Sequence, residues 1–63
     1  MTVHKSVTLP RVLVAIQEGG YPGFCVVCGV EADGVDPDAC GDECEECGEA
    51  ALYGAEELLI SIV

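Results

Sequence analysis

Four cysteines stand in two matching pairs, and pairs with this spacing are typical of metal-binding turns. Each pair has two residues between its cysteines and a glycine after the second one; the four cysteines are Cys25, Cys28, Cys44 and Cys47. Fifteen residues separate the pairs, which matches the spacing of a four-cysteine zinc site. Two intervening residues let both sulfurs reach one ion at about 2.3 Å while the backbone curls around it. The spacing therefore predicts one tetrahedral metal centre.

The glycine after each pair has a conformational reason. This position of the turn often takes a positive φ, which costs free energy for any residue with a Cβ, so Gly29 and Gly48 suit it. The turn also aims backbone N–H groups at the sulfurs, which disperses the thiolate charge. Both features favour two pseudo-symmetric halves of one site.

The identity of the ion is open to two interpretations. One Zn²⁺ with four protein ligands is a structural site with no open position for catalysis. A single iron in a rubredoxin uses the same pair of pairs, and iron could also load on recombinant expression. Rubredoxins, however, have a longer intervening segment and an aromatic-rich core, whereas this chain has two Tyr, one Phe and no Trp. We predict zinc, with a single-iron electron carrier as the alternative.

The remaining reactive residues do not predict catalysis. Cys40 could replace Cys44 as a ligand, but this would break the symmetry of the two turns, so we expect a free thiol. Glu45 and Glu46 have no nucleophile beside them, and His4 lies in a segment with no expected order. The chain has no phosphate-binding glycine loop, no Ser-His-Asp set and no HExxH motif. We therefore predict a protein that is not an enzyme.

The length of the chain explains why a metal would be needed. A 63-residue chain forms at most one domain, and such a domain rarely buries enough apolar surface without a disulfide or a metal. The odd count of five cysteines and the lack of a signal-like start favour reduced thiols, hence a cytoplasmic location (the host cytoplasm if the protein is viral). No apolar stretch is long enough to span a membrane.

The sequence predicts a small metal-stabilised α+β domain over residues 1–63, with knuckles of the zinc-ribbon or rubredoxin type. A helix is expected over about 9–18 and the ribbon over about 24–53, including a polar loop over 31–42. The C-terminal element, about 55–62, is a short helix or strand.

The first helix has clear start and stop signals. Thr8 is a suitable N-cap, Pro10 fits the first turn, and Gly19-Gly20 ends the pattern. An apolar stripe at helical spacing, expected to dock on the ribbon, consists of Leu9, Val12, Leu13 and Ile16.

The charge of the chain bears on its partners. Twelve acidic residues stand against two basic ones, Lys5 and Arg11, giving a net charge of −10. Such a surface repels nucleic-acid phosphates, so a nucleic-acid-binding ribbon is only an alternative. The acidity fits high solubility, a high-salt cytosol, or an anionic surface for a basic partner; we favour an acidic protein–protein interaction module. The apolar end, residues 60–63, could also pair with a second copy.

Three stretches of the chain resemble a family of small four-cysteine zinc-ribbon proteins of bacteriophages: residues 23–31, 34–39 and 44–60. The most specific parts are the two cysteine turns, the Asp-Pro-Asp-Ala loop and the Tyr-Gly-Ala-Glu-Glu-Leu-Leu end. The resemblance implies the same four cysteine ligands, a viral context and a role as a phage accessory factor. Its members are mostly known only as zinc-binding, so it implies no mechanism. The chain departs from the family at Cys40, where a polar or basic residue is usual.

Overall fold

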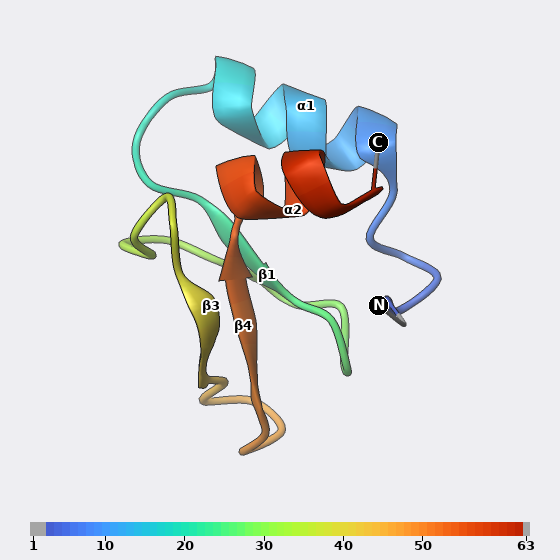
Figure 1. Cartoon of the computed structure of the whole chain (residues 1–63), viewed down its shortest axis with the longest axis vertical. Coiled ribbons are helices and arrows are strands. Elements are labelled where there is room, and N and C mark those ends of the chain that lie inside the picture. The colour runs from blue at the N-terminus through green and yellow to red at the C-terminus, as the bar shows by residue number, and fades with distance from the viewer. Residues whose placement is uncertain (1–2, 63) are drawn as a thin grey trace.

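The computed structural model describes the backbone of residues 3–62 and the side chains of residues 3–61. Two helices and a four-stranded antiparallel sheet form the chain in the order α1 (Leu9–Gln17), β1 (Gly23–Cys25), β2 (Glu31–Ala32), β3 (Cys40–Glu43), β4 (Ala50–Gly54) and α2 (Ala55–Ile62). The strands lie in the order β2-β1-β4-β3. The helices lie side by side at one end of the molecule, and the cysteine-bearing loops extend from the other (Figure 1). This confirms the small α+β class.

Helix α1 begins and ends close to where the sequence predicts. The side chain of Thr8 accepts a hydrogen bond from the backbone N–H of Arg11, and Gly19 follows the helix with a φ of 87°. The buried face differs from the predicted stripe: Val12 and Ala15 are buried, whereas Leu13 is 38 % exposed. Ala15 has a small side chain, which allows a close approach on the face where the second helix packs.

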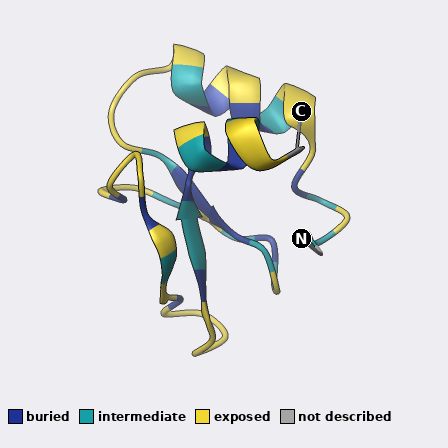
Figure 2. Cartoon of the chain, in the orientation of Figure 1, coloured by how far each residue is buried: buried dark blue, intermediate teal, exposed yellow. Residues whose placement is uncertain are grey.

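The main apolar core lies between the helices and the near end of the sheet (Figure 2). Its buried members are Val7, Val12, Ala15, Phe24, Ala55 and Leu58. Helix α1 therefore docks on α2 and on Phe24 of β1, with Val26 and Tyr53 packed against the same core. The prediction that it docks on the ribbon is correct in part. Burial of these side chains stabilises one end of the molecule independently of the cysteines.

The predicted polar loop over 31–42 is wrong in part, because it contains β2 and most of β3. Both are short edge strands defined by their partners: Phe24 pairs with Glu31, and Cys40 pairs with Tyr53. Glu-Ala in β2 and Cys-Gly-Asp-Glu in β3 have low strand propensity, so pairing, not local preference, makes them strands. Between them the chain turns at 36–38, since the backbone N–H of Ala39 donates to the carbonyl of Asp36.

The C-terminal element is a helix, which resolves the choice between helix and strand over 55–62. Glu56 and Glu57 occupy its first turn, where their charge is favourable near the helix N-terminus. Val63, at the end of the predicted apolar tail, lies outside the described residues. None of the helices in the described part of the chain has the length and hydrophobicity to cross a bilayer.

The N-terminal segment is ordered where the sequence predicts no clear order. The backbone N–H of His4 donates to the carbonyl of Val26 at 2.7 Å, and Val7 is buried in the main core. His4 Nδ1 also lies 2.8 Å from the hydroxyl of Ser6. The prediction is wrong because the hydrogen bond between His4 and Val26 joins residues 22 positions apart, which no local pattern reveals. Met1 and Thr2 lie outside the described residues.

Candidate metal centre

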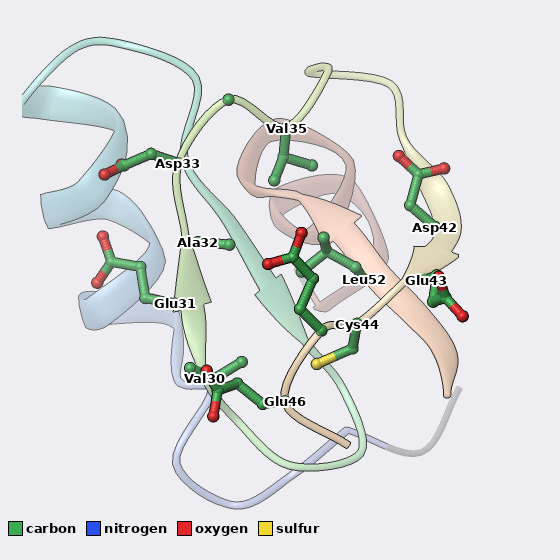
Figure 3. Close-up of a pocket in the computed structure, with 12 residues that line it drawn as sticks. Val30, Glu31, Ala32, Asp33, Val35, Asp42, Glu43, Cys44, Glu46 and Leu52 are labelled. Atoms are coloured by element: carbon green, nitrogen blue, oxygen red, sulfur yellow. The ribbon is translucent and has the colours of Figure 1, made fainter. Parts of the chain in front are cut away.

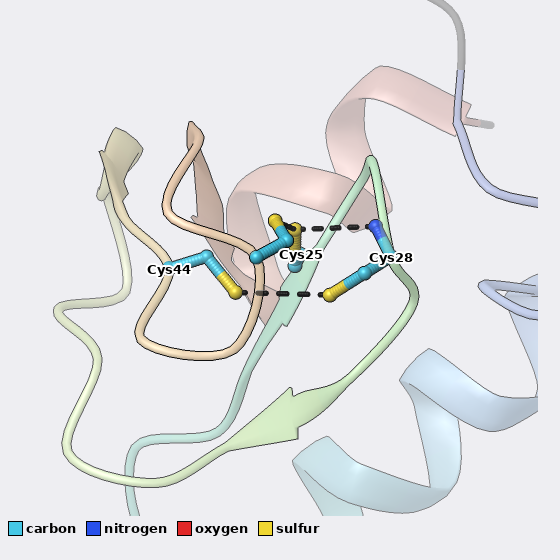
Figure 4. Close-up of side chains that lie close together, drawn as sticks. Cys25, Cys28 and Cys44 are labelled. Carbon is cyan, nitrogen blue, oxygen red and sulfur yellow. Dashed lines mark hydrogen bonds between the residues drawn. The ribbon is translucent and has the colours of Figure 1, made fainter.

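The fold brings the four predicted cysteines together. One turn joins β1 to β2 and the other joins β3 to β4, and the four Sγ atoms lie within 4.8 Å of one another (Figure 4). The Sγ atoms are 3.6 Å apart between Cys25 and Cys47 and 3.7 Å apart between Cys28 and Cys44. A tetrahedron with metal–sulfur bonds of about 2.3 Å has edges of about 3.8 Å. The cluster therefore has the size of a four-sulfur metal site.

Both turns have the same backbone. The N–H of Gly29 donates to the carbonyl of Cys25, and the N–H of Gly48 donates to the carbonyl of Cys44, at 2.9 and 2.8 Å. The two glycines have φ values of 81° and 78°, which confirms the predicted positive φ. In the first turn, the N–H of Cys28 also donates to the Sγ of Cys25 at 3.4 Å. A backbone N–H aimed at a sulfur stabilises the thiolate form.

The cysteines of each turn differ in exposure. The first members, Cys25 and Cys44, are 0 % and 1 % exposed and pack with Ala51 in a second small cluster. The second members, Cys28 and Cys47, are half-buried and exposed. The centre therefore has an inner wall of two buried sulfurs and an outer wall open to solvent.

The thiols differ in acidity because of their neighbours. Burial raises the pKa of Cys25, but backbone N–H groups of Cys28 and Val27 outweigh it and lower this pKa to about 7. The N–H of Glu49 favours the thiolate of Cys47, yet desolvation and the three other sulfurs raise its pKa to about 12. Desolvation and the adjacent sulfurs of Cys25 and Cys44 likewise raise the pKa of Cys28, against the N–H of Val30.

Four thiolates this close together need a cation. Like charges disfavour one another at this distance, so the protein alone does not hold all four sulfurs ionised. A divalent ion supplies the opposite charge and lets every sulfur deprotonate. Zinc and iron both favour an all-thiolate tetrahedral set, so the four cysteines could hold either ion.

Cys40 lies apart from this cluster. It is exposed in β3, and the group that could hold an ion among the described residues contains Cys44 instead. All five cysteines are free thiols. The Sγ atoms of Cys25 and Cys47, for example, are 3.6 Å apart, far more than the length of a disulfide bond, about 2.05 Å. His4 is not in the cluster, and Glu45 and Glu46 are exposed between the ligands.

Arg11 braces the first turn, a role that the sequence does not predict. Its guanidinium donates to the carbonyls of Gly29 and Ser6, each at 3.1 Å, and lies 4.9 Å from the centre of the Phe24 ring. Arg11 and Gly29 are eighteen positions apart, with most of α1 and all of β1 between them, so no spacing rule pairs them. The one sequence signal is that Arg11 is among only two basic residues in a very acidic chain.

No protein family, curated protein or solved structure matches this chain. The interpretation of the centre therefore depends on the geometry of its own four sulfurs. The resemblance to phage zinc-ribbon proteins is not tested by these comparisons and stays a prediction.

Proposed function

We propose that this chain is a non-enzymatic protein in which one structural Zn²⁺ fixes an acidic surface that binds a protein partner. The observation that supports the metal is the clustering of four sulfurs within 4.8 Å. Zn²⁺ bound by Cys25, Cys28, Cys44 and Cys47 has a complete tetrahedral shell, which leaves no position for a substrate. The ion would act on the fold, by joining the two turns.

The small size of the cluster around the sulfurs supports a structural role for the ion. Its buried members are only Cys25, Cys44 and Ala51, so two of the three are themselves metal ligands. Structural zinc contributes about 10–16 kcal/mol in zinc-finger peptides, far more than one buried alanine. Without the ion, we expect β3 and the second turn to become disordered.

The charge distribution supports a basic protein as the partner. Twelve acidic residues give a net charge of −10, and zinc with four thiolates would add −2. Of the two basic side chains, Arg11 is held by backbone carbonyls within the fold. Such a field speeds the approach of a basic surface and opposes nucleic acid.

Native mass spectrometry of the purified protein tests the metal. A colourless protein with one zinc, which loses tertiary structure when a chelator removes the ion, supports the proposal. A red protein with one iron and a reversible potential would instead support the single-iron electron carrier. Protein that stays equally folded without any ion would overturn the structural role.

Capture from a lysate with immobilised zinc-loaded protein tests the partner. The matched control is the same protein after chelation, which has the same sequence but lacks the fixed turns. We expect a basic protein that binds only the zinc-loaded form and elutes as salt rises above about 0.15 M, where the Debye length is near 8 Å. Recovery of no partner at low or moderate salt contradicts the proposal, and DNA binding that persists at that salt favours the nucleic-acid alternative.

A further inference from the structure

The sheet carries an open groove of about 400 Å³ that no helix lines. One wall is β2 with the loop after it, and the other is β3 with the second cysteine turn (Figure 3). Its apolar surface comes from Val30, Val35 and Leu52. Leu52 pairs with Cys25 in the neighbouring strand, so these two face away from the Phe24 and Tyr53 pair that packs in the helical core.

The groove collects half of the acidic residues of the chain. Its lining includes no Lys, Arg or His, and its acids are Glu31, Asp33, Asp42, Glu43, Glu45 and Glu46. All six are exposed, but they do not all face the groove. Glu31 pairs with Phe24 on the helical face of the sheet, and Figure 3 shows Glu31 and Asp33 pointing toward α1. The other four come from β3 and the second cysteine turn, so a bound basic segment would meet negative charge along one wall and apolar side chains beside it.

We propose that this groove binds an extended segment of a protein partner, rich in lysine and arginine and carrying one aliphatic residue. The aliphatic side chain covers Leu52, and the basic side chains reach the carboxylates of β3 and the second cysteine turn. This inference rests on the proposed function and names its surface and the chemistry of its partner. Charge complementarity selects the occupant, and the apolar surface distinguishes the groove from an ordinary solvated acidic face.

Other occupants fit less well. The carboxylates are spread along the walls, and the cysteine cluster is the one group of metal-ligating side chains close enough to hold an ion in the described part of the chain. A second copy of the chain would bring another −10 charge against the groove, and nucleic acid would bring phosphates. An extended polycation matches charges that are arranged along β3 and the second cysteine turn.

The metal centre and the groove share one segment. Cys44 lines the end of the groove, and Glu45 and Glu46 lie between the two cysteines of the second turn. An ion that fixes this turn would also fix these two carboxylates relative to the apolar side chains of the groove. Binding is therefore expected to require the zinc-loaded form.

A titration of the ¹⁵N-labelled, zinc-loaded protein with a synthetic peptide tests the groove. The probe has three basic residues, alternately lysine and arginine, on each side of one leucine. At low salt we expect amide shifts confined to the strands and turns that line the groove. Serine in place of the leucine should weaken binding about threefold to tenfold, because a partly buried aliphatic side chain is lost.

Two double variants of equal charge sharpen this test. D42N/E46Q neutralises two carboxylates that line the groove, and E18Q/E56Q neutralises two exposed carboxylates outside it, at the end of α1 and in α2. We expect the first to weaken peptide binding about threefold to tenfold and the second less than twofold, because an exposed ion pair is weak and acts only at short range. All four positions are exposed, and the spectra themselves report whether each variant is folded.

Equal weakening of peptide binding by both variants would mean that only net charge matters, and it would overturn the proposal that the groove is the binding site. Shifts centred on another surface, or no peptide binding by the wild-type protein, would also overturn it. The proposed function fails separately, when lysate capture recovers no partner. A captured partner that binds D42N/E46Q as well as the wild-type protein supports the function and overturns the proposal that the groove is the binding site.

Discussion

The two cysteine turns have the same pattern and the same backbone, yet their surroundings differ. The first turn, residues 25–29, is contacted by the N-terminal segment and by Arg11, whose guanidinium donates to the carbonyl of Gly29. A Cβ added to Gly29 would overlap the hydroxyl of Ser6, whereas a Cβ added to Gly48 would meet nothing within 4 Å. The second turn, residues 44–48, is exposed apart from Cys44.

The two turns are therefore held in position in different ways. Hydrogen bonds and the neighbouring apolar core hold the first turn, so it can form without an ion. The second turn lacks such a brace and depends on the ion for its position. The first turn is therefore preformed, whereas the second turn takes its position only when the ion binds.

Removal of the ion should have the largest effect. Chelation is expected to collapse the amide dispersion of residues 40–52, while residues of the first turn and helix α1 keep partial protection from hydrogen exchange. The reason is that the main core is independent of the sulfurs and the second cluster is not. Two-dimensional NMR before and after chelation measures this. Uniform loss of order across the chain would contradict the distinction between the two turns.

Alanine at the two equivalent glycines gives the next largest difference. Gly48→Ala places a Cβ at positive φ, which costs about 1–2 kcal/mol. Gly29→Ala has the same strain, and its Cβ would also lie 2.7 Å from Nδ1 of His4, so we expect about 3 kcal/mol in total. Urea unfolding of the zinc-loaded variants compares them. Equal losses would show that Ser6 and His4 do not hold the first turn.

Loss of the Arg11 brace should have a moderate effect. Arg11→Ala removes the hydrogen bonds to Gly29 and Ser6 and the contact with the Phe24 ring, and we expect a loss of about 1–2 kcal/mol in unfolding free energy. Lys5→Ala is the control, because Lys5 is the other basic residue and is exposed. Faster amide exchange in the first turn, with no change in the second, would identify the brace as local; similar losses in both variants would attribute the effect to charge alone.

The sequence predicts those features whose physical cause is local. The cysteine spacing and the following glycine describe one turn completely, and Thr8 with Gly19 marks the ends of α1. The strands β2 and β3 could not be predicted, because two to four residues without strand propensity become strands only through pairing with β1 and β4. The brace between Arg11 and Gly29 was equally hidden, since it depends on how the first helix crosses the sheet.

The smallest effect is expected from a substitution at Cys40, and it tests whether Cys44 and Cys47 are the ligands from the second turn. Cys40→Ser changes an exposed side chain outside the sulfur cluster, so it should shift unfolding free energy by less than about 0.5 kcal/mol and leave one ion bound. Cys44→Ser, four residues further on, is the matched change and removes a buried sulfur that faces Cys28 at 3.7 Å. Native mass spectrometry of both variants compares their metal content. Retention of the ion in Cys44→Ser and its loss in Cys40→Ser would mean that the second turn uses a different pair of cysteines, and the equivalence of the two turns would then fail.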